Sequence, residues 1–155
     1  MKKLEFGQTF NLLANLGVLV GLLLLVFELS QTRQMMEAQT RHELSQGIID
    51  QGIAVATDRE LAELIEKAQT GKLNSRAEEI QWNWWLIARV RYWEDVHYQY
   101  RLGLFDQAEF ESQLKSFAEN FERPEMSEWW SRRKFGYSPD FVSAMDELIS
   151  DNTSE

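Results

Sequence analysis

The chain has 155 residues, a formal net charge of −9 and no cysteine. The missing cysteines exclude disulfides, thiolate metal sites and thiol catalysis, and the acidic charge opposes binding to the phosphate backbone of nucleic acids. Hydrophobic residues make up 44% of the chain and aromatic residues 12%, which is ample for one core.

The N-terminal region holds no charged residue between Phe6 and Phe27 and contains the run NLGVLVGLLLLVF. At a rise of 1.5 Å per residue, about 20 apolar residues span the ~30 Å hydrocarbon core of a bilayer. The alternative is a cleaved signal peptide, for which Lys2 and Lys3 supply the basic start. The apolar run exceeds the roughly 7–15 residues of such a region, and FELSQTRQ lacks a small-residue cleavage pattern. We therefore expect residues 1–33 to form a membrane anchor helix.

Small and polar residues gather on one face of this expected anchor, where Gly17 and Gly21 form a Gly-xxx-Gly motif. Small residues let membrane helices approach closely, and amides within hydrocarbon favour hydrogen-bonding partners. The face therefore predicts a homo-oligomer held by Asn11, Ala14, Asn15, Gly17 and Gly21. The alternative is an oligomeric pore or channel lined by the anchor helix, although Val18 and LLLLVF leave its second half little polar lining.

An acidic helical domain is expected over residues 34–150. An acceptor three residues before an acid marks helix starts at Thr57, Ser75 and Asp106. Glycines mark helix ends, and the two prolines suit first-turn positions. The predicted helices are the anchor continued to about residue 56, then 58–70, 75–102, 106–122, 124–134 and 139–150, before a disordered tail at 151–155. The sequence thus predicts an all-α protein in which a single N-terminal transmembrane helix continues into a compact helical bundle.

The helix expected over 75–102 contains WNWWLIARVRYWEDVHYQYRLG, with four of the six tryptophans. Its aromatic and aliphatic residues recur at helical spacing, which is typical of the central helix of a bundle. The alternative is a pocket around Trp93 for a small apolar or cationic ligand, with Arg89, Arg91 and Glu94 at its mouth.

A second aromatic cluster, SEWWSRRKFGYSPDF, places Trp129 and Trp130 just before a basic run that includes Arg132 and Arg133. Cations near a helix C-terminus complement the helix dipole, so the run is explained as a charged last turn. The alternative is a docking patch for an acidic protein partner.

Glu94 and His97 form a Glu-x-x-His motif, the spacing found in carboxylate-bridged di-iron bundles. Such sites need the motif twice and two further glutamates, but the only other histidine, His42, lacks the acid. We place His42 on an inward row with Met35, Ala38, Ser45, Ile49 and Gly52, so the two histidines could meet. A metal-binding or small-molecule-binding bundle enzyme around Glu94 and His97 is therefore a further alternative, whereas no motif predicts a catalytic residue or a cofactor.

The segments NLGVLVGLLLLVFELSQTRQ, DRELAEL, WEDVHYQYRLGLFD and EWWSRRKFGYSPDFVSAMDEL, in this order, resemble a family of small uncharacterised bacterial proteins with one N-terminal transmembrane helix and an acidic, Trp-rich helical domain. The likeness covers nearly the whole chain and is most specific over 93–105 and 129–141. It implies a single-pass protein of the bacterial inner membrane, and its arginines after the anchor imply a cytoplasmic domain. The resemblance supplies no activity.

We therefore predict a membrane-anchored, homo-oligomeric helical scaffold protein without enzymatic activity. Its expected partners are the lipid bilayer, further copies of the chain and an unidentified protein, and nucleic acid is not among them.

Overall fold

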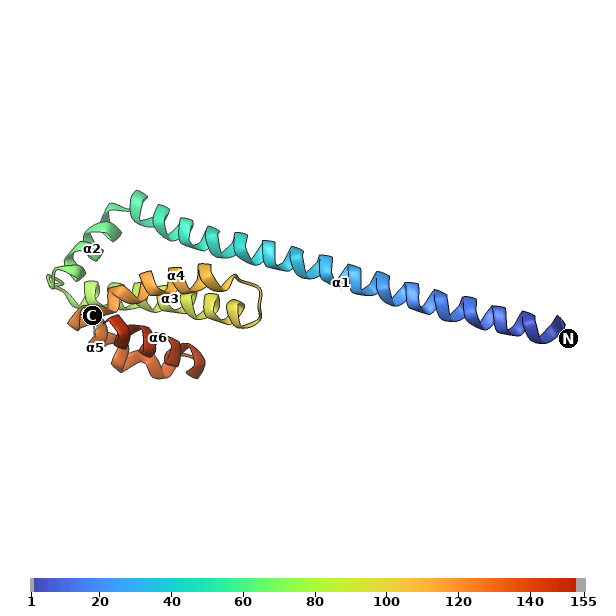
Figure 1. Cartoon of the computed structure of the whole chain (residues 1–155). Helices are drawn as coiled ribbons and strands as arrows, with labels where there is room; N and C mark the ends of the chain where they lie inside the picture. Colours follow the sequence, from blue (N-terminus) through green and yellow to red (C-terminus); the bar gives the residue numbers. More distant parts are fainter. Residues whose placement is uncertain (1, 153–155) are drawn as a thin grey trace. The chain divides into compact units, whose positions relative to one another are not determined.

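The computed structural model describes residues 2–152, and all regular structure in this range is helical (Figure 1). The elements are α1 (Lys2–Thr57), α2 (Arg59–Gln69), α3 (Arg76–Arg101), α4 (Gln107–Ala118), the 3₁₀ turn η1 (Glu119–Glu122), α5 (Pro124–Arg133), the 3₁₀ turn η2 (Lys134–Gly136) and α6 (Pro139–Asn152). This confirms the predicted all-α class. The chain divides into two compact units, residues 1–39 and 40–155, of which the second begins six residues later than the expected domain.

The helix boundaries follow the side chains that satisfy free backbone amides. The carboxylates of Asp58 and Asp106 each accept a hydrogen bond of 3.0 Å, from the backbone N–H of Leu61 and of Glu109. The cap of α2 is thus Asp58 and not the expected Thr57, because the hydroxyl of Thr57 donates back to the Ile53 carbonyl at 2.7 Å. An N-cap of this kind contributes about 1 kcal/mol.

The helix ends also follow local chemistry. Gly71 and Gly103 have φ angles of +65° and +70°, which side chains disfavour and which let the chain turn after α2 and α3. At the C-terminus, α6 includes Asp151 and Asn152, so these two residues of the expected disordered tail are helical. Residues 153–155 of that tail lie outside the described residues.

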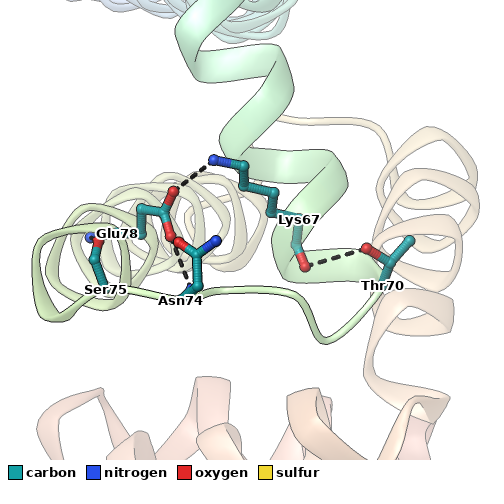
Figure 2. A network of polar contacts seen from close by, with 5 residues as sticks. All are labelled: Lys67, Thr70, Asn74, Ser75 and Glu78. Carbon is teal, nitrogen blue, oxygen red and sulfur yellow. Dashed lines mark hydrogen bonds and ion pairs between the residues drawn. The ribbon is translucent and has the colours of Figure 1, made fainter.

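A network of polar contacts fixes the turn between α2 and α3, and Figure 2 shows its members. One carboxylate oxygen of Glu78 accepts from Lys67 Nζ at 2.6 Å, and the other accepts from the Asn74 backbone N–H at 2.9 Å. The Ser75 hydroxyl caps α3 by accepting from the Glu78 N–H at 3.2 Å. These bonds lower the pKa of the Glu78 carboxyl, first through Lys67. The network joins the two helices and thereby sets the position of α2 on α3.

Residues 7–36 of α1 are all exposed, including the whole apolar run. The side chains of Leu13, Leu19 and Leu23 are 61%, 53% and 63% exposed. The helix from Gly7 onwards is long and apolar enough to cross a membrane, and none of its most apolar window is buried. The described chain thus offers this surface no packing partner.

The second unit is built around α3, which contacts α2, α4 and α6. The side chains of Val90, Val96, Phe121 and Phe141 are fully buried. Phe121 lies on η1, which contacts α4, α5 and α6, so the short turn joins three helices to one core. Aromatic rings fill much of this core, and Trp93 stacks on Phe117 at 5.1 Å between ring centroids.

The last part of α1 packs on α3 through Leu44, which is buried. The Tyr92 hydroxyl donates to the Leu44 carbonyl at 2.5 Å, and a Cβ on Gly47 would lie only 2.7 Å from Tyr92 Cε2. Burial first, and Asp95 second, raise the pKa of Tyr92 to about 12. The expected inward row through His42 is therefore wrong: His42 is exposed, and the row through Leu44 and Gly47 faces α3.

The burial of the tryptophans on α3 gives a matched test of the core. Trp93 is 7% exposed and Trp84 on the same helix is 64% exposed. We expect Trp93→Ala to lower the free energy of unfolding by about 3–5 kcal/mol through lost burial and a cavity, and Trp84→Ala to change it by about 0.5 kcal/mol or less. Urea denaturation followed by circular dichroism measures both. Equal effects of the two substitutions would refute this assignment of the core.

Candidate functional site

The Glu94 carboxylate binds the loop before α6. Its Oε1 accepts from the Ser138 backbone N–H at 2.5 Å, and its Oε2 pairs with Arg91. The Arg91 guanidinium also donates to the Gly136 carbonyl at 2.6 Å and lies 4.4 Å from the ring centroid of Tyr137. Arg91 and Glu94 thus form a clamp, named here the Arg91–Glu94 clamp, that holds residues 136–138 on α3.

His97 lies one turn further along α3, inside the core. Its ring is 5.8 Å from that of Phe110 and 5.7 Å from that of Phe141. Burial, followed by the Arg101 guanidinium, lowers the pKa of His97, although Asp140 and Glu94 act in the opposite direction. The environment therefore favours the neutral imidazole.

These positions bear on the metal hypothesis. Both oxygens of Glu94 are engaged in the clamp, and His42 is exposed on α1 while His97 is buried. Over residues 2–152, no group of three or more histidine, cysteine, aspartate or glutamate side chains could hold a metal ion. Glu94, His97 and His42 are thus not brought together as ligands by the part of the chain that is described.

The buried His97 predicts a pH dependence of stability. Because its pKa is lowered in the folded chain, the unfolded chain binds the proton more tightly. The contribution of the neutral His97 to the free energy of unfolding is therefore fully present above the ordinary histidine pKa of about 6.5, and it is lost as the pH falls below that value. We expect His97→Gln to lose less stability than the wild type between pH 7.5 and pH 5. His42→Gln is the control, and urea midpoints at each pH measure the effect. A wild-type pH dependence retained by His97→Gln would contradict this explanation.

The two tryptophans of α5 are buried and bonded. Trp129 Nε1 donates to Asn83 Oδ1 at 3.0 Å, and Trp130 Nε1 donates to the Asp146 carboxylate at 2.8 Å. Lys134 Nζ lies 2.7 Å from the other oxygen of that carboxylate. The aromatic pair therefore anchors α5 to α3 and α6, and its exposed edge is small.

The arginines after this pair remain exposed. Arg132 and Arg133 line a groove of about 680 Å³ together with Arg76, Trp82 and Trp129. Arg76 and Arg132 are ion-paired with neighbours on their own helices. The groove is the basic part of an acidic unit, and the predicted docking of an acidic protein partner at this place stays a prediction.

A smaller cavity of about 40 Å³, also lined by Trp82, lies between α2, α3, α4 and η1 with the start of α5. We name it the Arg89 cavity, because among its lining side chains Arg89 has a buried nitrogen without a hydrogen-bond partner. Apolar side chains form most of its wall, namely Ile65, Ala68, Trp82, Leu86, Phe117 and Met126. The polar lining comes from Gln69, Arg89, Asn120, Arg123 and Glu125.

The structure separates Arg89 from the two residues with which the sequence grouped it. The Arg89 guanidinium carbon lies 5.6 Å from the ring centroid of Phe117 on α4, whereas Arg91 and Glu94 bind residues 136–138. Trp93 stacks on Phe117 within the core. The three side chains expected at the mouth of one pocket therefore belong to two separate sites. Arg91 and Glu94 form the clamp, and Arg89 lines the cavity.

The face of the anchor that carries Asn11, Ala14, Asn15, Gly17 and Gly21 is exposed along its whole length. A Cβ added to Gly17 or Gly21 would meet no atom within 4 Å. Nothing in the described chain covers this face, so it is available to another molecule.

Comparison of the chain with protein-family models, with curated proteins and with solved structures finds no match. The resemblance inferred from the sequence motifs therefore stays a prediction.

Proposed function

We propose that the protein is a membrane-anchored helical scaffold whose copies associate through the first half of α1. The observation that carries this proposal is the complete exposure of residues 7–36, which include the uncharged apolar run. In water such a surface costs about 25 cal/mol for each Å² left unburied. Hydrocarbon removes that cost, and the helix satisfies its own backbone hydrogen bonds there.

Self-association accounts for the small and polar residues within this apolar segment. Asn11 and Asn15 carry amides that have no water to bond with in hydrocarbon, so a neighbouring helix is their best source of partners. The open space beside Gly17 and Gly21 allows a second backbone to approach to van der Waals contact. A homo-oligomer satisfies both conditions with one interface.

The type of membrane and the orientation of the chain in it are proposed from the sequence. Lys2 and Lys3 before the anchor balance Arg33 and Arg41 after it in number, so the charges do not decide the orientation. We therefore follow the family resemblance and propose a bacterial inner membrane with residues 40–155 in the cytoplasm. The helical unit then acts by binding and not by catalysis. The basic groove at Arg132 and Arg133 is the part of it that suits an acidic protein.

A pair of substitutions on opposite faces of α1 tests this proposal. Gly21→Leu places a side chain at the proposed helix contact, whereas Leu23→Phe adds volume about 200° around the helix. We expect Gly21→Leu to shift the full-length protein in detergent towards monomer and Leu23→Phe to leave the wild-type oligomer. Native mass spectrometry counts the copies.

Two results would overturn this account of the anchor. A strictly monomeric wild type removes self-association, and identical oligomers in all three proteins remove the Gly21 face as its cause. Circular dichroism of each variant verifies that the helical content is retained, so that loss of the oligomer is not loss of the fold.

A further inference from the structure

The Arg89 cavity is lined by a cationic group that forms no ion pair with the described residues. Arg89 Nε is buried without a hydrogen-bond partner, and no carboxylate of the described residues pairs with this guanidinium. Its nearest recorded interaction is the face of Phe117 at 5.6 Å. Burial lowers the pKa of Arg89, yet arginine stays protonated in proteins because its ordinary pKa exceeds about 12.

Among the nitrogens of Arg89, only Nε is buried without a partner, and a half-buried cation without a counter-ion is unfavourable. Most other arginines of this acidic chain are ion-paired, as Arg76 is with Glu79 and Arg101 with Asp140. Arg89 differs in that it has no ion-pair partner among the described residues and lines a cavity. An anion entering the cavity would supply the missing partner.

The other polar groups limit the charge of that anion. The Asn120 amide donates to the Phe117 carbonyl at 2.9 Å, so it is not a free donor. The remaining charged groups of the lining are the cation of Arg123 and the carboxylate of Glu125, both on exposed residues. Two guanidinium groups and one carboxylate sum to a single positive charge, which matches a monovalent anion better than a multivalent one.

The size and the walls of the cavity limit the anion further. A volume of about 40 Å³ holds about three water-sized groups, which is enough for a carboxylate group and leaves only a short alkyl chain to lie along the apolar wall. Trp82, Leu86 and Phe117 offer apolar contact beside the guanidinium. A guanidinium binds a carboxylate through two parallel hydrogen bonds, a geometry that a spherical ion such as chloride does not use.

From this juxtaposition of an unpaired Arg89, a small cavity and apolar walls, we propose that the cavity is a binding site for a short-chain aliphatic monocarboxylate. The carboxylate lies on the Arg89 guanidinium, with Arg123 at the mouth, and the alkyl chain lies against Trp82 and Phe117. The site makes the helical unit a receptor for a small metabolite. It is independent of the proposed self-association, since none of its residues lies on α1.

Propionate is the probe, added to the full-length protein in a detergent without carboxylate groups. We expect the melting temperature to rise with sodium propionate and to saturate, as ligand binding to the folded state requires, while sodium chloride at equal ionic strength has no such effect. Sodium phosphate is the second comparison. Saturation-transfer NMR on the propionate methyl group measures binding directly.

The variants separate a binding residue from a structural one. Arg89→Met keeps an unbranched side chain and removes the charge, so we expect its ligand-free melting temperature to exceed that of the wild type and its propionate response to vanish. A purely structural Arg89 predicts the opposite shift. Arg76→Gln, on the same helix but 81% exposed at the side chain, is the control and keeps the wild-type response.

Arg123→Gln tests the site should Arg89→Met fail to fold. We expect it to weaken propionate binding about threefold, in line with an exposed ion pair. Three results would overturn the proposal: no propionate response beyond that of chloride, a response to phosphate without one to propionate, or an unchanged propionate affinity in the Arg89 and Arg123 variants.

Discussion

The apolar surface of α1 is the constraint on which the account of this protein depends. Residues 7–36 are exposed on every side, so no part of the described chain shields the leucines and valines between Phe10 and Leu29. The hydrophobic effect makes such a surface unfavourable in water, and a lipid environment is the solvent in which a lone apolar helix keeps all its backbone hydrogen bonds. The proposed membrane location and the proposed self-association both rest on this one feature.

Within the second unit, α3 has two functions that its sequence combines. One side supplies the core, where Val90, Trp93 and Val96 are buried and the helix contacts α4 and α6. The other positions attach neighbours through polar groups: Glu78 holds α2, Tyr92 holds α1, and Glu94 holds the loop before α6. Aromatic and charged residues are therefore interspersed along α3, because the helix both packs into the core and attaches neighbouring segments through hydrogen bonds.

Much of this architecture could be predicted from periodicity and helix-capping residues. The apolar run predicted a helix long and apolar enough to cross a membrane, and Ser75 and Asp106 marked helix starts that the structure confirms. The burial of Trp93 agrees with the interpretation of the aromatic residues of α3 as core, although Trp84 on the same helix is exposed. The row of α1 residues that was predicted to face inward through His42 was wrong. Side-chain volume decides which face of α1 contacts α3, because Gly47 leaves the space that Tyr92 occupies.

The Arg89 cavity depends on contacts that single-helix spacing does not contain. Its walls come from α2, α4 and α5 as well as α3, and these helices are brought together only by the tertiary fold. One signal was nevertheless present in the sequence. Arg89 lies three residues after Leu86 and four before Trp93, so an arginine interrupts an apolar stripe at helical spacing. A charge at such a place indicates either a buried ion pair or a binding site, and the structure shows no ion pair for it among the described residues.

The most direct test of the central claim uses the absence of cysteine, because any single cysteine introduced is the only thiol in the chain. Leu19→Cys places the thiol in the middle of the apolar run, and Ser143→Cys places it on an exposed position of α6. In membrane fragments treated with a membrane-impermeant maleimide, the account predicts rapid labelling of Ser143→Cys and labelling of Leu19→Cys only after detergent is added. Equal labelling of the two thiols before detergent would contradict insertion of α1 into the bilayer.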